Sequence, residues 1–309
     1  MPARFILSLD CEGKWGVADH LDAEHHQTLS DASLRHAYRS IIGLLDEFRI
    51  PATFAFVGLF GESSGSFPRL RPAIERLATR APDYIGPALR DIDGGSGEGW
   101  HGDWAVDAVG AAATSHEIGM HGVTHVPWDR MDGDFVADEM SIYDELSGPV
   151  GNSRTMVYPR NRVAHADLLP GFGIEGYRTA PRPRSRSNSF ASEFDLLAKA
   201  ERDAPWTGSG PVSIPAGYFV NWQKGLRRLV PFAISKRRFA NILADAETGG
   251  GIVHFWLHPE NVASAPATLD LLRMMARHVA RSRDAGRCRV LTQASYCEEA
   301  KARFQTVAA

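Results

Sequence analysis

Short apolar runs alternate with segments of helical period along most of the chain. The first run, 5–9, is followed by apolar residues at helical spacing between 34 and 48, and Pro51 separates these from a second run at 52–58. Further strands are expected at 116–121, 155–159, 175–180, 210–217, 251–258 and 287–292, and further helices near 134–146, 236–247 and 267–282. Apolar strands that alternate with helices are typical of a parallel sheet covered on both faces, and their number suits an α/β barrel.

The segment 60–113 interrupts this alternation. It contains the glycine-rich stretch DIDGGSGEGWHGDWA at 91–105, and one helix is expected near 70–80. It is either a plain surface insertion or a wall of the substrate site, since long irregular segments often carry function. We favour the wall, which would present Trp100, His101, Asp103 and Trp104.

Composition excludes several classes of protein. A chain of 309 residues fits one α/β barrel or two smaller domains, and 44% hydrophobic residues can form a sizeable core. The formal net charge of -3 argues against a broad nucleic-acid-binding face. No nucleic-acid partner is therefore expected.

Cysteine usage and hydropathy bear on the cellular compartment. The three cysteines form no Cys-x-x-Cys pair, which argues against a disulfide framework and against a zinc site built on thiolates. The sequence shows no secretion-signal pattern and no run of about 18 apolar residues. These observations predict a soluble, cytoplasmic protein.

The stretch SHEIGMHGVTH at 115–125 contains three histidines. His121 and His125 are four residues apart, so on a helical turn they would share a face and could bind one metal ion. The His-Glu-x-x-His pattern of zinc proteases is excluded, because His116 and His121 are five residues apart. A catalytic metal usually takes a third protein ligand, which Asp10 or Glu12 could supply from the end of the first strand.

Other polar residues also follow predicted strands. The segment VYPRN ends at Asn161, and FWLHPEN contains Trp256 and His258. In parallel α/β folds, catalytic groups gather at the carboxyl ends of the strands, so these side chains are expected to meet. His254 shares a strand face with Trp256 and His258 but lies deeper, and we expect a hydrogen-bonded core histidine there.

The segments SLDCEG, HEIGMHGVTH, YPRN and FWLHPEN, in this order, resemble the motifs of the polysaccharide deacetylases, also called the NodB-homology or carbohydrate esterase 4 superfamily. The resemblance spans nearly the whole chain and favours the branch associated with surface-polysaccharide and O-antigen biosynthesis. It implies a distorted (β/α)7-type barrel of parallel strands. It also implies one catalytic domain over 1–309, with 60–113 inserted after the second strand and lining the substrate site.

The resemblance also implies the roles of individual residues. Asp10 matches the general base and His258 the general acid. Glu12, displaced by one position from the usual second Asp, would bind a divalent metal together with His121 and His125. Zn2+ is the default metal, and Mn2+, Co2+ and Ni2+ also suit two imidazoles and a carboxylate.

The third motif departs from the usual pattern, because Val157 and Arg160 stand where the family has Arg and Tyr. Arg160 is expected to support the base from another direction. The basic loop around 178–189 could bind a phosphate or a uronate, or it could be a solvated loop. The substrate-binding residues that we expect are Trp100, Tyr158, Asn161, Arg182, Arg184 and Trp256.

The implied reaction is hydrolysis of an N-acyl group, most simply N-acetyl, from an amino sugar in cell-surface polysaccharide or lipopolysaccharide biosynthesis. The sugar would be a small molecule or would be linked to a nucleotide or lipid-pyrophosphate carrier. The alternatives are a sugar N-deformylase, an allantoinase-like amidase and a catalytically silent carbohydrate-binding homologue.

The segment 222–240 mixes apolar and basic residues, so it is an interfacial segment or, more ordinarily, a helix packed on the barrel. Membrane association is expected to be at most peripheral. The sequence makes no prediction of oligomeric state.

Overall fold

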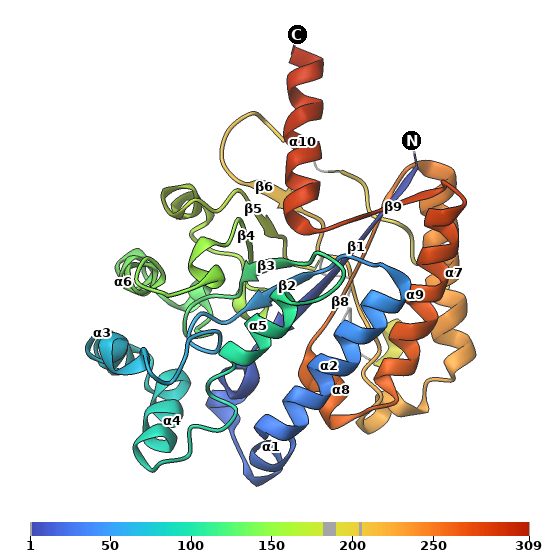
Figure 1. Ribbon diagram of the computed structural model, residues 1–309. Helices are drawn as coiled ribbons and strands as arrows, with labels where there is room; N and C mark the ends of the chain where they lie inside the picture. The colour runs from blue at the N-terminus through green and yellow to red at the C-terminus, as the bar shows by residue number, and fades with distance from the viewer. Residues whose placement is uncertain (1, 182–189, 204–205, 309) are drawn as a thin grey trace.

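One curled sheet of nine parallel strands organises the computed structural model, which describes residues 2–181, 190–203 and 206–308 (Figure 1). The strands lie in the order β6-β5-β4-β3-β2-β1-β8-β7, and β9 pairs with β1. Their bounds are β1 Ala3–Cys11, β2 Thr53–Phe56, β3 Glu117–Met120, β4 Thr155–Val157, β5 Gly176–Arg178, β6 Val212–Ile214, β7 Tyr218–Phe219, β8 Ile252–Leu257 and β9 Cys288–Leu291. Within the described residues β6 and β7 do not pair, so the sheet is an open, distorted barrel.

β1 is the central strand, and all nine of its residues are buried. One side pairs with β8 through Arg4–Leu9 of β1, and the other pairs with β9 through Ala3–Ile6 and then with β2 through Ser8–Cys11. The carboxyl end of β1 therefore lies in the middle of the sheet. Residues that follow it are surrounded by the ends of neighbouring strands.

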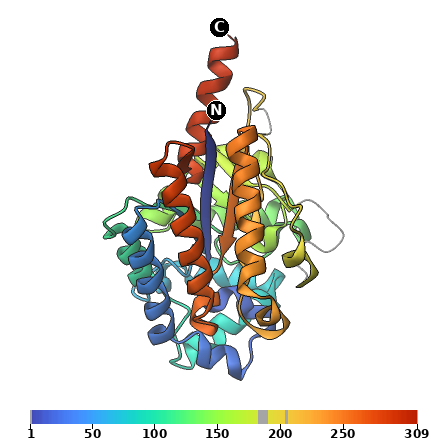
Figure 2. The same cartoon turned by 90° about the vertical axis from the view of Figure 1, so that its right-hand side faces the viewer.

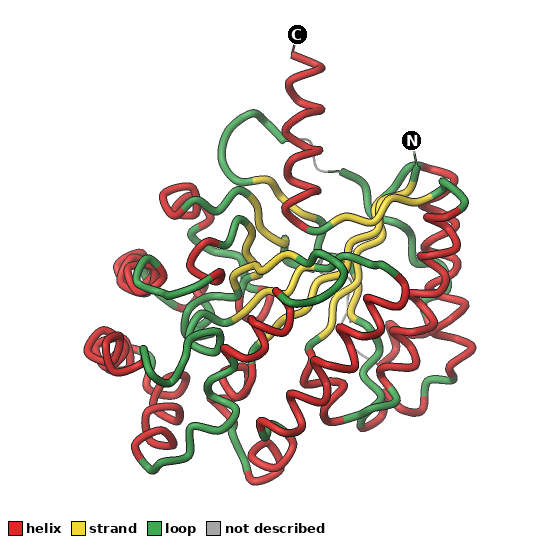
Figure 3. Tube along the Cα trace, in the orientation of Figure 1, coloured by secondary structure: helices red, strands yellow, loops and turns green. Residues whose placement is uncertain are grey.

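Helices cover the outside of the curled sheet (Figure 3). α2 faces the core with Leu34, Tyr38, Ile41 and Leu45, which recur at helical spacing. Figure 2 shows α7 and α9 on either side of β1, and both helices pack on each other. The helices are α1 Ala23–Thr28, α2 Asp31–Phe48, α3 Phe67–Arg80, α4 Pro82–Asp93, α5 Asp103–Gly110, α6 Gly133–Tyr143, α7 Phe232–Gly249, α8 Pro259–Ser264, α9 Thr268–Asp284 and α10 Gln293–Ala308.

The structure confirms the parallel α/β prediction and the eight strands expected from the sequence. The interval 60–113 differs, because it contains α3, α4 and α5 where a single helix near 70–80 was expected. α10 was also missed, since it buries little more than Tyr296, Cys297 and Ala300 and therefore has a weak apolar stripe. None of the described helices combines the length and the apolar character that crossing a membrane requires.

Candidate active site

Two acids follow each other at the carboxyl end of β1. Asp10 is 1% exposed, and Glu12 comes directly after the strand. Cys11 between them points into the core beside Tyr38, as expected from strand alternation, and burial raises the pKa of its thiol. Gly13 lets the chain turn away at once: its φ is +56°, and a Cβ there would lie 2.5 Å from the Gly99 carbonyl oxygen.

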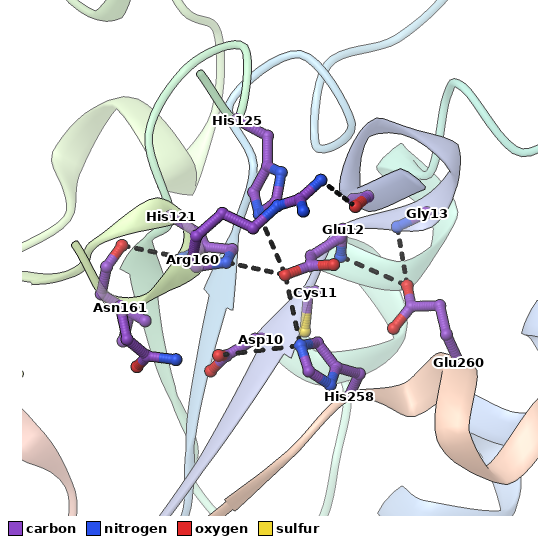
Figure 4. Close-up of polar contacts among 12 residues, drawn as sticks. Asp10, Cys11, Glu12, Gly13, His121, His125, Arg160, Asn161, His258 and Glu260 are labelled. Carbon is purple, nitrogen blue, oxygen red and sulfur yellow. Dashed lines mark hydrogen bonds and ion pairs between the residues drawn. The ribbon is translucent and has the colours of Figure 1, made fainter. Parts of the chain in front are cut away.

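His121 and His125 lie in the loop that follows β3, and their ring centroids are 4.9 Å apart (Figure 4). The four-residue spacing of these histidines suits a helical turn, but this segment is not helical. Gly122 has a φ of +70° and His125 a φ of +62°, and these two left-handed residues fold the loop back on itself. The two imidazoles converge because of the loop conformation.

The two histidines and Glu12 fit a divalent metal. His121 Nδ1 donates to the Val157 carbonyl oxygen at 2.8 Å, so the lone pair of Nε2 faces Glu12 Oε1, which is 2.9 Å away. His125 Nε2 lies 3.0 Å from the same oxygen, and neither ring nitrogen of this buried histidine has a hydrogen-bond partner among the described residues. The three ligand atoms lie within 4.8 Å of one another. Two imidazole nitrogens and one carboxylate suit zinc and several of its neighbours.

His258 follows β8 and reaches the same place from the other side of β1. Its Nε2 lies 3.3 Å from Glu12 Oε1 and 4.0 Å from Asp10 Oδ2. Burial lowers the pKa of His258, but the carboxylates of Glu12 and Asp10 outweigh burial and raise the pKa to about 10. Asn261 Oδ1 contacts Nδ1 at 3.1 Å and fixes the ring orientation.

Arg178, the last residue of β5, is the main site residue that the sequence analysis missed. Its guanidinium donates to both oxygens of Asp10, at 2.7 and 2.6 Å, and to Asn161 Oδ1 at 2.8 Å. Burial raises the pKa of Asp10, but this bidentate contact outweighs it and the net shift is downward. Arg178 also stacks 4.7 Å from the Trp256 ring centre. Its place at the end of a predicted strand was the signal that could have identified it.

The contact expected of Arg160 is therefore made by Arg178. The Arg160 side chain turns towards the 3-10 helix η1 (Gly13–His20), where it donates to Asp19 at 2.6 Å and to the Gly16 carbonyl oxygen at 3.1 Å. Arg160 has a φ of +58°, which directs the chain out of β4 towards this rim. It lies beside the site without touching the carboxylate of Asp10.

A cavity of about 380 Å³ opens beside these groups. Trp256 and Asn161, two of the expected substrate-binding residues, line it, and so does Arg160. The cavity is also lined by residues that were not expected from the sequence, among them His20, His25, Trp222, Lys224 and Glu260. The cavity thus has an acidic floor and a rim of aromatic and basic side chains.

Two expected substrate-binding residues belong to the core instead. Trp100 is fully buried, and its indole donates to Asp91. Tyr158 is 1% exposed and packs edge-to-face on Trp128. Neither lines the cavity, because aromatic residues at strand and loop ends are equally useful for packing.

The remaining positions that were singled out in the sequence are the range 60–113, the arginines of the basic loop, and the histidines His254 and His116. None of the described residues that line this cavity comes from 60–113, so that insertion is not its wall. Arg182 and Arg184 lie outside the described residues. His254 is a core histidine, as expected: it donates to the Pro215 carbonyl oxygen at 2.5 Å, and burial lowers its pKa to about 3. His116 is half-buried and accepts from the Ala52 amide at 3.2 Å.

Two further carboxylates contact the backbone of the site: Glu139 is buried, and Glu260 is half-buried and lines the cavity. Glu139 on α6 accepts hydrogen bonds from the backbone amides of Val123 and Thr124, at 3.2 and 2.7 Å, and these two residues lie between His121 and His125. Glu260 on α8 accepts from the amides of Glu12 and Gly13, at 3.2 and 2.6 Å (Figure 4). Both carboxylates therefore hold the backbone that carries the proposed ligands.

Comparison with known proteins gives a likeness of structure alone. No family model and no curated protein sequence matches this chain. Among solved structures, a candidate polysaccharide deacetylase from Mycobacterium smegmatis has a TM-score of 0.58 and 16% identity, over 98% of this chain and 92% of that one. Another candidate polysaccharide deacetylase, from Pseudomonas aeruginosa PAO1, has a TM-score of 0.54 and 12% identity, over 96% and 89%. PuuE allantoinase has a TM-score of 0.53 and 14% identity, over 96% and 88%. The chain therefore shares the α/β fold of the polysaccharide deacetylases.

Proposed function

We propose that this protein is a metal-dependent amidohydrolase that removes an N-acyl group, most simply acetyl, from an amino sugar. One observation carries the proposal: Glu12, His121, His125, Asp10 and His258 converge beside one cavity. The fold shared with polysaccharide deacetylases supports this reaction class.

The proposed mechanism assigns one task to each group. A divalent ion held by Glu12, His121 and His125, most simply Zn2+, would polarise the acyl carbonyl and acidify a water molecule. Asp10 accepts the proton of the attacking water, and its bidentate pair with Arg178 keeps the carboxylate ionised and fixes its direction. The imidazole of His258 faces the same cavity and delivers a proton to the departing amine.

The cavity also supports an amino sugar as the substrate. Trp222 and Trp256 offer aromatic faces of the kind that pack on sugar rings, while Lys224 and Arg160 lie at the rim, paired with Glu24 and Asp19. A phosphate or a carboxylate on the sugar or on its carrier would replace Glu24 or Asp19 as the partner of these two cations. We therefore propose a nucleotide-linked or lipid-pyrophosphate-linked sugar of surface-polysaccharide biosynthesis, including O-antigen and lipopolysaccharide, processed in the cytoplasm.

The test is mass spectrometry of N-acetyl and N-formyl amino sugars, free and nucleotide-linked, after incubation with metal-loaded protein. A loss of about 42 mass units identifies deacetylation, and a loss of about 28 identifies deformylation. Allantoin in the same panel tests the ureide alternative. Binding of a sugar without turnover of any compound would contradict hydrolysis and favour a silent carbohydrate-binding protein.

Matched variants test the assigned roles. Asp10→Asn should abolish turnover, whereas Asp129→Asn, at an acid on the surface, should not. Metal content should be lost in the double variant His121→Ala/His125→Ala and retained in His26→Ala/His36→Ala, where both histidines are exposed. Unchanged metal content in the first double variant would refute the ligand assignment.

A further inference from the structure

A stretch without acidic residues lies next to the cavity. Between 206 and 244 the chain has no Asp or Glu, while six of its residues are Lys or Arg. This stretch contains Trp222 and Lys224 of the cavity wall, the 3-10 helix η7 (Gly225–Leu229) and the start of α7. In Figure 2, α7 begins at the end of the molecule where β1 ends. The basic stretch is therefore on the same side of the protein as the candidate active site.

Large apolar side chains are exposed on this stretch and beside it. Among the described residues six large hydrophobic side chains are exposed, and all but Phe304 belong to η6, η7, α7 or the chain just after η6. The five are Phe194 (43% exposed), Leu197 (85%), Leu226 (70%), Leu229 (60%) and Phe232 (48%). Exposed leucines are ordinary when scattered, but several large apolar side chains exposed on segments that contact one another indicate an interaction surface.

An internal ion-pair cluster holds these segments together. The buried carboxylate of Glu193 in η6 (Phe190–Phe194) contacts Arg227 of η7 at 2.8 Å and Arg238 of α7 at 3.2 Å. The segments that carry the apolar side chains are therefore fastened to one another. Since Arg227 and Arg238 are engaged by Glu193, the exposed positive charge of this face comes from Arg228, Lys236 and Arg237.

The combination of side chains favours a lipid surface over a protein partner. Protein interfaces are depleted in Lys, and Leu is under-represented among their hot spots, whereas this face presents three exposed leucines beside Lys236. Apolar residues flanked by unneutralised cations are typical of peripheral binding to anionic bilayers. A side chain that is 85% exposed, such as Leu197, stands clear of the protein and can enter the interfacial region.

We propose that this face binds the surface of an anionic bilayer. We call it the docking face, and it consists of Phe194, Leu197, Leu226, Arg228, Leu229, Phe232, Lys236 and Arg237. Because Trp222 and Lys224 line the cavity just before η7, the bound protein would hold its cavity next to the lipid headgroups. Resting on the proposed function, this placement favours an amino sugar carried on a lipid pyrophosphate over a freely diffusing one.

Sedimentation of the full chain with vesicles tests the docking face. We expect binding to vesicles of equal parts phosphatidylglycerol and phosphatidylcholine, little binding to phosphatidylcholine alone, and release as salt rises. The triple variant Leu226→Ser/Leu229→Ser/Phe232→Ser should weaken binding at least about tenfold. Phe304→Ser, at the exposed aromatic residue of α10, is the matched control and should bind like the unaltered protein.

A second pair of variants tests the charge contribution. Arg228→Gln/Lys236→Gln/Arg237→Gln should lose about fivefold in affinity per charge and lose the preference for anionic lipid. The control variant Arg39→Gln/Arg76→Gln/Arg277→Gln removes three exposed charges outside the docking face. It should keep both the affinity and the preference for anionic lipid. Equal binding of both charge variants, or full binding of the apolar triple variant, overturns the proposal.

Other results separate this inference from the proposed function. Absence of vesicle binding, with self-association in analytical ultracentrifugation that the apolar triple variant abolishes, would make the face a contact between copies and overturn lipid docking. Turnover of a water-soluble amide substrate should be unchanged in the apolar triple variant, because these side chains do not line the cavity. If the unaltered protein turns over its substrate but does not bind vesicles, only the docking face is refuted. If it binds vesicles but turns over no substrate, only the enzyme is refuted.

Discussion

Replacing Glu139 with Gln tests whether a buried carboxylate holds the loop between His121 and His125, the two proposed metal ligands. One oxygen of Glu139 accepts from Val123 N, Thr124 N and Thr124 Oγ1, and the other accepts from Trp128 Nε1 at 2.5 Å. Burial raises the pKa of this carboxyl group, while the four donors favour its ionised form. A glutamine has only one oxygen, so its NH2 group must face a donor on one side.

The expected cost follows from that mismatch. If the amide oxygen of the new glutamine still accepts from the Val123 and Thr124 amides, the buried Trp128 indole N–H loses its acceptor. This loss costs about 1–3 kcal/mol of unfolding free energy. Bonds to the loop also weaken because they are no longer charge-assisted. We expect Glu139→Gln to lose about 2–4 kcal/mol of unfolding free energy. Metal affinity should fall about 10- to 100-fold, as for other groups that orient ligands from behind.

Urea denaturation and competition with a chromogenic chelator measure these two quantities separately. Asp138→Asn is the matched control, because it is the neighbouring acid on α6 but is exposed. Wild-type stability and metal affinity in Glu139→Gln would refute the reasoning. A stability loss with unchanged affinity would show that the loop is held without this carboxylate.

Three further results are expected. Arg178→Lys should lower kcat about 10- to 100-fold, because one ammonium cannot replace the bidentate grip on the proposed base; an unchanged rate on the substrate of the unaltered protein would contradict this. In the folded protein the pKa of Glu175 is lowered to about 2, chiefly by a hydrogen bond from Arg154. This ion pair contributes about 1 kcal/mol to the free energy of unfolding when the pH is above the unfolded pKa of Glu175, and the contribution is lost as the pH falls through about 2. Urea midpoints of Glu175→Gln and unaltered protein should differ near neutral pH and converge in acid, and a constant difference would argue against the ion pair. Gly122→Ala should destabilise more than Gly148→Ala in thermal unfolding, because both glycines have positive φ but only the first new Cβ would lie 2.8 Å from Pro159; equal losses would remove the clash as the cause.

The fold was predictable because strand and helix periods differ and the strands are short and apolar. The run that ends at Asp10, the repeat from 34 to 48 and the run at 251–258 each became the expected element. The helices α4 and α5 were not predictable in the same way. Their segment is rich in glycine and proline, and burial of Tyr84, Ile85 and Trp100 overrides these weak local preferences.

Site residues were predictable where a titratable or metal-binding side chain lies at the carboxyl end of a predicted strand. Asp10, Glu12 and His258 follow directly from that rule, because carboxyl ends of parallel strands meet. Arg178 obeys the same rule, but β5 is only three residues long. The sequence around it has no periodic pattern that shows where the strand ends and the loop begins. Trp100 and Tyr158 show the opposite error, since an aromatic residue near a motif has no sequence mark that separates a substrate wall from a packed core.

The central position of β1 has a consequence for the order in which the chain is synthesised. β1 leaves the ribosome before the other strands, but Arg4 pairs with Ile252 of β8, and β9 follows only at Cys288. At usual rates of translation the strand waits about 10–50 s for its partner. During that time an apolar strand edge has no neighbour on one side, which is the condition under which nascent chains aggregate or recruit chaperones.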